Sequence, residues 1–214
     1  MGVGSSDASL YRFFYQSYVY ISNKKERHLK RSIREFEASD IDLMINYFLN
    51  ADHEFLRGMG VEPSKLPNSD KWRQIVLEDF ERPVEHRRLY YVIWEIDNTP
   101  VGHSNLNKII YGQEAFMHLH LWQPEKRRSG NGTYFINESI SCYFTKFHLQ
   151  NLFCEPYALN PAPNKTLPKS GFELVKTYET TPGLINFNQT VHRWILTKEK
   201  WLPKSQTIAP NPEE

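Results

Sequence analysis

The chain has 214 residues, with 26 Lys or Arg against 25 Asp or Glu, so its formal net charge is only +1. This balance excludes a general basic field, and we expect neither a nucleic-acid nor a membrane partner. No apolar run approaches the roughly 20 residues of a membrane span. Residues 1–9 lack the basic and apolar regions of a signal peptide, so we expect a cytoplasmic protein.

The composition also limits redox and metal chemistry. The two cysteines, Cys142 and Cys154, lie in apolar stretches without a CxxC pattern. We interpret them as buried thiols in a reducing compartment rather than as a disulfide or a nucleophile, and we expect no metal site.

Three segments differ in character. Residues 1–28 form an N-terminal arm that is dense in aromatic residues, a candidate for packing, for a substrate lid or for the contact of a homodimer. Residues 29–201 carry the pattern of one mixed α/β domain, without a linker or repeat. Residues 202–214 contain three prolines and no apolar period, which predicts a mobile tail.

The apolar periodicity predicts the order β, α, α, β, β, β, α, β, α-like, β, β within the domain. Ser39 is expected to cap the first helix, with Asp42 as the capping-box acid. The other helical segments are expected over 69–80, 133–148 and, interrupted by prolines, 160–170. Strands are expected over 30–37, 89–96, 101–110, 114–122, 151–159, 171–178 and 191–198.

The most informative segment runs from a strand through the basic turn Arg127-Arg128-Ser129-Gly130-Asn131-Gly132 into a helix. Backbone N–H groups in such a turn point inward, and the helix start adds a positive dipole end. The two glycines let the backbone approach a phosphate, although they are also compatible with a simple turn. A Walker loop and a dinucleotide fingerprint are disfavoured, because no GK[ST] follows and the third glycine is missing.

The turn resembles the coenzyme A motif Q/R-x-x-G-x-G/A of the GNAT superfamily of N-acetyltransferases, in which a proline like Pro124 commonly precedes the motif. Downstream, Asn160 is followed eleven residues later by Gly171-Phe172, with Lys169 just before. This arrangement resembles the N-x-x-S…K-x-GF segment of the same superfamily, especially of its ribosomal-protein N-terminal acetyltransferase (RimJ/RimL-like) branch.

The resemblance, which covers about residues 29–200, implies the GNAT acyl-CoA N-acyltransferase fold. This is an α/β (α+β) fold with a central mixed, mostly antiparallel sheet of about seven strands and about four helices. It also implies acetyl-CoA as cosubstrate, with pantetheine in a V-shaped opening between the strands 114–122 and 151–159. Lys165 is a candidate contact to a coenzyme phosphate, and the sequence is equally compatible with a solvated lysine on the surface. The coenzyme-binding residues that the resemblance implies are Leu121, Trp122, Arg127, Arg128, Ser129, Gly130, Asn131, Gly132, Thr133, Asn160 and Lys165.

Amide formation from a thioester requires a neutral amine, so a base must take a proton. His118 and His120 are the candidates, because they share one face of the strand that leads to the turn. The position of a common family glutamate is Phe116 here. The run His118-Leu119-His120 resembles that of serotonin acetyltransferase-like enzymes, but only His118 falls on a histidine position of that pattern. Either histidine is also compatible with an ordinary half-buried side chain.

The general acid is not defined by the resemblance. Many GNAT enzymes have a tyrosine as the acid at the position of Leu167 in this chain. The N-terminal acetyltransferase branch often has a serine at the position of Pro163. Tyr157 is a substitute or a structural residue, and the thiolate can also leave unassisted.

We expect acetyl transfer to a primary amine of a small molecule or of a protein N-terminus. Acylation of a hydroxylamine in siderophore assembly, which the run Glu155-Pro156…Asn160 resembles, stays open. Binding of acyl-CoA without turnover and a generic α+β binding domain are further alternatives. The residues expected around the amine are aromatic and acidic, a composition that suits a cation: Phe55, Trp72, Tyr178, Phe187, Glu54, Glu62 and Glu179.

Overall fold

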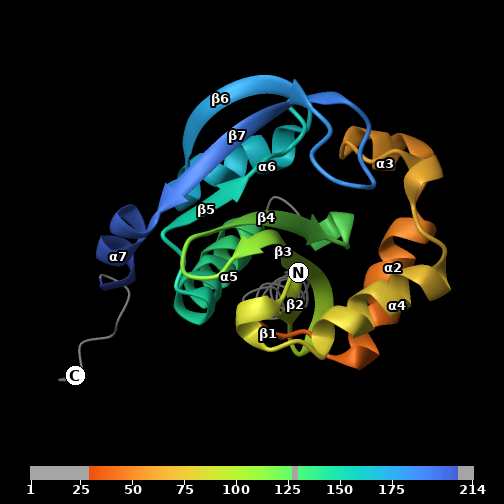
Figure 1. Ribbon diagram of the computed structural model, residues 1–214, viewed down its shortest axis with the longest axis horizontal. Helices are drawn as coiled ribbons and strands as arrows, with labels where there is room; N and C mark the ends of the chain where they lie inside the picture. Colours follow the sequence, from red (N-terminus) through yellow and green to blue (C-terminus); the bar gives the residue numbers. More distant parts are fainter. Residues whose placement is uncertain (1–28, 127–129, 207–214) are drawn as a thin grey trace, which may run out of the picture. The chain divides into compact units, whose positions relative to one another are not determined.

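The structure is a computed structural model that describes residues 29–126 and 130–206. The N-terminal arm 1–28 lies outside the described residues, so its suggested roles stay predictions. From Arg31 onward the described residues belong to one compact unit, built on a seven-stranded sheet of order β1-β2-β3-β4-β5-β7-β6 (Figure 1). The strands are β1 Arg31–Glu35, β2 Tyr90–Ile96, β3 Thr99–Ile110, β4 Glu114–Leu121, β5 Asn151–Cys154, β6 Glu173–Thr180 and β7 Gln189–Thr197.

All neighbouring strands are antiparallel except β4 and β5, which are parallel. The expected mixed, mostly antiparallel sheet of seven strands is therefore confirmed. The described residues contain six α-helices rather than about four: α2 Ile41–Leu49, α3 His53–Gly58, α4 Ser69–Phe80, α5 Asn131–Phe147, α6 Pro161–Thr166 and α7 Lys198–Gln206. Short 3-10 turns occur at Ala38–Asp40, Pro63–Lys65, Val84–His86, Pro124–Lys126 and Leu167–Ser170.

Alternate residues of the central strands serve two separate apolar cores. On β2, Val92 and Trp94 face the core that includes α5, where Trp94 stacks on Phe135 with ring centroids 5.2 Å apart. Ile93 faces the core that includes α2 and α4, and Figure 1 shows these two helices side by side, apart from α5. This two-residue period is the geometry of a strand covered on both faces.

The same period orients β4. Ala115 and Met117 pack in the core of α5, with Leu119 and Leu121 packed against it. His118 and His120 consequently project from the opposite face of the sheet. The predicted alternation of this strand is confirmed, and it is the feature that positions the site.

The start of α2 differs from the expectation. The backbone N–H of Glu37 donates to Asp40 Oδ2 at 2.9 Å, so Asp40, not Asp42, is the capping acid. Arg34 holds the buried Asp40 carboxylate with two hydrogen bonds of 2.6 and 2.8 Å, whereas Asp42 pairs with Arg73. Residues 38–40 form a 3-10 turn, which delays the α-helix to Ile41.

Two further boundaries also differ. Helix α7 reaches Gln206 and so includes the first residues of the expected tail, because Trp201 stacks on Phe144 with centroids 4.9 Å apart. Residues 207–214 lie outside the described part. Strand β5 ends at Cys154, well before residue 159. In the described residues, no helix is both long and apolar enough to cross a membrane.

Candidate active site

Strands β4 and β5 separate after three paired positions. The last pair is Phe116 with Phe153, whose rings stack with centroids 5.1 Å apart. Beyond it β4 continues along β3, whereas Cys154 pairs with Trp194 of β7. A gap therefore opens between the two formerly parallel strands, as expected for the V-shaped opening.

The hydrogen-bonding phase of β4 determines which backbone groups face this gap. The N–H of Trp122 donates to the carbonyl of Val101 on β3 at 2.8 Å. Because antiparallel strands alternate between paired and outward-facing residues, Met117, Leu119 and Leu121 direct their backbone polar groups away from β3, toward the gap. Of the two residues expected to contact the coenzyme here, Leu121 keeps that orientation. The backbone N–H of Trp122 instead donates to β3 and does not face the gap.

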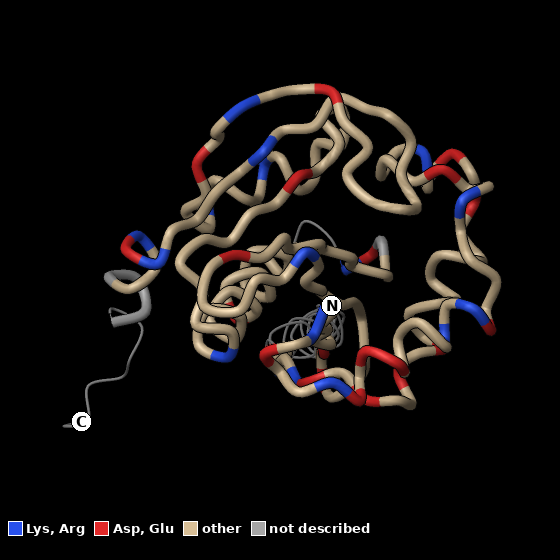
Figure 2. The backbone as a smooth tube through the Cα atoms, in the orientation of Figure 1, with Lys and Arg blue, Asp and Glu red and all other residues tan. Residues whose placement is uncertain are grey.

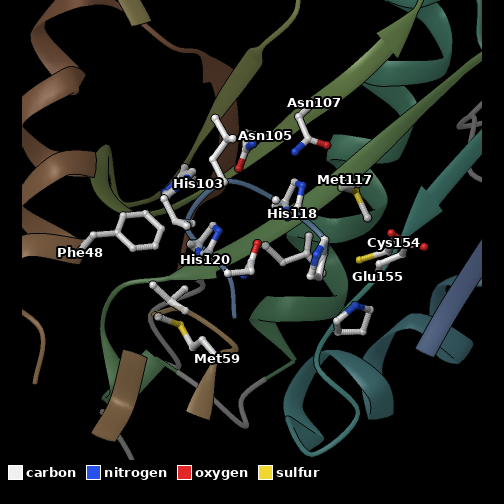
Figure 3. Close-up of a pocket in the computed structure, with 18 of the residues that line it drawn as sticks. Phe48, Met59, His103, Asn105, Asn107, Met117, His118, His120, Cys154 and Glu155 are labelled. Carbon is white, nitrogen blue, oxygen red and sulfur yellow. The ribbon is translucent and has the colours of Figure 1, made fainter. Parts of the chain in front are cut away.

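A cavity of about 290 Å³ continues from the gap across the face of β3 and β4 that is opposite α5 (Figure 3). Phe48 of α2 points toward His120 from one side, and Cys154 and Glu155 lie on the other. The segment after β5 and the loop 182–186 complete the wall. His118 and His120, which were predicted as catalytic candidates, both line this cavity.

A third histidine joins them from β3. His103 lies opposite His120 in the sheet register, and their rings stack with centroids 4.6 Å apart. The indole Nε1 of Trp122 donates to His103 Nδ1 at 2.8 Å, which places the proton of a neutral His103 on Nε2. Among the described residues, no hydrogen-bond partner reaches the buried Nε2 of His118 or Nδ1 of His120.

All three imidazoles are held neutral. Burial, and secondarily the charge of Lys108, lower the pKa of His118 to about 4, while Glu155 opposes this effect. Burial lowers the pKa of His103 to about 3, and that of His120 well below its ordinary value. All three rings are therefore in their base form at pH 7, and the same burial disfavours their protonated form. His103 Nδ1 already accepts from Trp122, so the lone pairs left for an incoming proton are those of His118 and His120.

The opposite wall carries one carboxylate. Glu155 Oε1 accepts from Arg193 Nε at 2.5 Å and from the hydroxyl of Tyr178. The Glu155 side chain is only 3% exposed. Arg193 also lies over the ring of Phe116, 5.5 Å from its centroid. The position where the family commonly has a base thus holds an aromatic ring, and the nearby carboxylate is neutralised.

The three positions considered for the general acid lie in different surroundings. Leu167 is buried in the core, whereas Pro163 and Tyr157 line the cavity. The Tyr157 ring packs edge-on against Phe187 with centroids 5.6 Å apart. Of these positions, only Tyr157 offers a hydroxyl to the cavity.

The glycine turn leads into α5, which begins at Asn131 rather than at Thr133. Gly130 has φ +77° and no side-chain cap, and Asn131 Nδ2 donates to the carbonyl of Lys126 at 3.0 Å. Among the described residues, a Cβ on Gly132 would meet nothing within 4 Å. Residues 131–133 form the first turn of α5. Arg127, Arg128 and Ser129 lie outside the described residues.

Asn160 lines the cavity and caps α6, accepting from Ala162 N at 3.3 Å. Lys165 is exposed on α6 and does not line the cavity. The sequence reasoning missed Asn164, whose Nδ2 donates to the carbonyls of Tyr157 and Asn160 at 3.0 and 2.8 Å. Its Oδ1 accepts from Trp194 Nε1 at 2.9 Å, which ties this wall to β7.

The expected aromatic and acidic composition of the acceptor pocket is only partly right. Trp72 lines the cavity, but Phe55 and Glu54 line a separate shallow hollow. Glu62 pairs with Arg57 at 3.0 Å, and Tyr178 is bound to Glu155. Glu179 and Phe187 are absent from the described lining of the cavity. Charged side chains seek counter-ions or water rather than an apolar wall, and Glu62 has such a counter-ion in Arg57.

No family model and no curated protein sequence matches this chain. Solved structures do match. Spermidine N-acetyltransferase from Vibrio cholerae, in complex with CoA and spermine, is 19% identical with a TM-score of 0.66, over 80% of this chain and 98% of that one. RimL, a ribosomal L7/L12 alpha-N-protein acetyltransferase in complex with coenzyme A, is 14% identical with a TM-score of 0.63, over 78% and 93%.

An uncharacterised protein from Bacillus halodurans is 13% identical with a TM-score of 0.62, over 83% of this chain and 89% of that one. At these identities the likeness concerns the fold. The chain has the fold of the GNAT N-acetyltransferases, as the resemblance of its glycine turn implied.

Proposed function

We propose that this chain transfers the acetyl group of acetyl-CoA to a primary amine that enters the cavity beside β4. The observation that carries the proposal is the gap between β4 and β5, with neutral histidines along one wall. The N-terminus of α5 follows β4 along the chain. This combination supplies a channel for an extended thioester, a proton acceptor and an anion site.

The coenzyme fits the groups that surround this gap. Met117 and Leu119 direct backbone polar groups toward it, where the two amides of pantetheine need partners. The first-turn N–H groups of residues 132 and 133 suit a pyrophosphate, and no described atom lies within 4 Å of a Cβ added at Gly132. Leu121 and Asn131 stay predicted contacts. Arg127, Arg128, Ser129 and Lys165 stay predicted contacts, and Asn160 is a further one from the facing wall.

We assign the base to His118 rather than to His120. The strands part immediately after Phe116, so His118 is two residues from the narrow end of the gap and His120 is four. A thioester that extends from the glycine turn toward the narrow end reaches His118. His120 instead stacks on His103 and lies with its ring centroid 5.0 Å from that of Phe48.

The chemical step is a direct displacement. The amine nitrogen forms a bond to the acetyl carbonyl carbon, and the bond from that carbon to sulfur breaks. The proton that leaves nitrogen passes to His118, and the coenzyme thiolate takes one from Tyr157 or from solvent. A gap-facing N–H of β4 is available to the transient oxyanion.

The decisive experiment is a pair of measurements on the wild type and on His118→Ala. Acetyl transfer to an amine panel should fall by about 10²–10⁴-fold in the variant, the usual contribution of a general base, while coenzyme A affinity stays within about twofold because the imidazole faces the amine. Coenzyme binding without turnover by the wild type would favour the non-catalytic alternative. Turnover of hydroxylamines alone would favour the siderophore alternative.

A further inference from the structure

We propose that the acceptor is a small primary amine with an aromatic or branched apolar body and no second cationic group, and not a polyamine. The inference rests on the proposed function and specifies its substrate class. It is based on the largely apolar and uncharged character of the residues that line the cavity.

The wall formed by α2 and α4 is aromatic and aliphatic. Phe48 and Trp72 lie with ring centroids 5.1 Å apart, and Met44 and Ile75 extend the surface. Tyr91 of β2 adds a further ring. Apolar and aromatic walls of this kind stabilise a ligand by removing its apolar surface from water.

The lining offers no counter-ion for a second ammonium group. Among the described lining residues, Glu155 is the one with a formal charge, and Arg193 already neutralises it. The three histidines are neutral. Because a buried cation without a partner is strongly disfavoured, a polyamine would have to leave its second ammonium outside.

The cavity is also closed by an uncharged loop. Residues 181–188 contain no charged residue and are drawn entirely in tan between β6 and β7 (Figure 2). Three hydrogen bonds, each of 2.8 Å, hold the loop against the segment after α3: Glu62 N donates to Ile185 O, Lys65 Nζ to Asn186 O, and Asn186 Nδ2 to Gly60 O. Asp52 and Glu54 line a separate hollow, which shares Met59 and Asn160 with the cavity, and neither acid lines the cavity itself.

The size of the cavity limits the amine further. A volume of about 290 Å³ lies at the lower end of ligand pockets, and the thioester must share it. One ring, or a branched chain of similar bulk, is the body that fits. The reacting amine then lies near His118, the histidine nearest the narrow end of the gap.

The test measures binding and turnover with the full-length protein. Calorimetry in the presence of coenzyme A should give a Kd for 2-phenylethylamine at least about tenfold lower than that for spermidine, the difference that one unpaired charge readily produces. The kcat/KM values for acetylation should follow the same order. Tighter binding of spermidine would overturn the inference, with or without turnover. The predicted binding order without any turnover would support it and contradict the proposed function instead.

A matched pair of variants locates the binding wall. Ile75 lines the cavity on α4, whereas Leu77 lies on the exposed side of the same helix. Ile75→Ala should enlarge the cavity at this wall by a few methylene volumes. The ratio of kcat/KM for the larger tryptamine to kcat/KM for 2-phenylethylamine should then rise about tenfold, the size of effect expected from such a change in a pocket. Leu77→Ala should leave this ratio unchanged. An unchanged ratio in Ile75→Ala would contradict the assignment of this wall.

Discussion

The imidazole rings of His103 and His120 are stacked, with planes 20° apart, although the residues come from different strands. Sheet register makes them direct neighbours, and Trp122 fixes the proton of His103 through its indole. Burial keeps both rings neutral. The proposed base, His118, therefore shares its face of the sheet with two further imidazoles that are held in their neutral form.

This neutrality makes stability depend on pH. The unfolded state protonates His103 near its ordinary pKa of about 6.5, whereas the folded state does so only near pH 3. Between these values the unfolded chain binds more protons, so the free energy of unfolding falls as pH falls. Between pH 7 and 5 the contribution of a fully buried histidine is roughly 2 kcal/mol.

Urea unfolding of the wild type and of His103→Asn at pH 7 and pH 5 measures this contribution. The wild type should lose more unfolding free energy than the variant between the two pH values. The comparison uses the difference across pH, so the loss of the Trp122 hydrogen bond in the variant does not affect it. An identical pH dependence would mean that His103 is not kept neutral by the fold.

The pH dependence of kcat/KM should reflect the pKa of the amine substrate rather than the pKa of a group on the enzyme. His118 already has its base form above about pH 5, since its pKa is lowered to about 4. The cavity offers an ammonium no free counter-ion, so kcat/KM should rise with pH until the free amine is neutral. Substituting an amine of lower pKa, such as trifluoroethylamine, should move the break to lower pH. A break near pH 6.5 for every amine would contradict this account.

Gly60 connects the loop 182–186 to the segment after α3. Its φ is +86°, and an added Cβ would lie 2.2 Å from Gln189 Oε1. Gly60→Ala should lower the unfolding free energy by more than the 1–2 kcal/mol of the left-handed backbone alone, and the loosened loop should raise the KM for the amine. Gly112→Ala is the matched control, because Gly112 has φ +74° and open space around it. Equal destabilisation of the two variants would show that the contact with Gln189 contributes nothing.

Asn164 holds the turn 157–160 in place through its amide. Asn164→Asp keeps the shape but brings a carboxylate against the carbonyls of Tyr157 and Asn160. We expect a loss of about 1–3 kcal/mol in unfolding free energy, the cost of an unsatisfied buried group, and a higher KM for the coenzyme. Asn188→Asp adds the same charge at an exposed position and should change stability by less than about 0.5 kcal/mol. Similar effects in both variants would attribute the result to charge alone.

The sequence pattern predicted that His118 and His120 line the site together, because side chains two residues apart in a strand share a face. They did not identify His103, although His103, Asn105 and Asn107 alternate in the same way on β3. Placing them beside His118 requires the register between the strands, which depends on pairing across the hairpin. The expected acidity of the acceptor pocket failed for a similar reason. Glu62 finds Arg57 five residues earlier, and sequence alone does not reveal that pairing.

Binding of coenzyme A to the glycine turn tests the central claim most directly, by calorimetry on the wild type, Gly132→Glu and Gly132→Gln. No described atom lies within 4 Å of a Cβ added at Gly132 and its φ is not left-handed, so both variants should fold alike. The account predicts micromolar binding by the wild type, near-complete loss in Gly132→Glu through repulsion of the phosphates, and a much smaller loss in Gly132→Gln. Binding that is equal in all three proteins, or absent from the wild type, would contradict the assignment of this turn to the coenzyme.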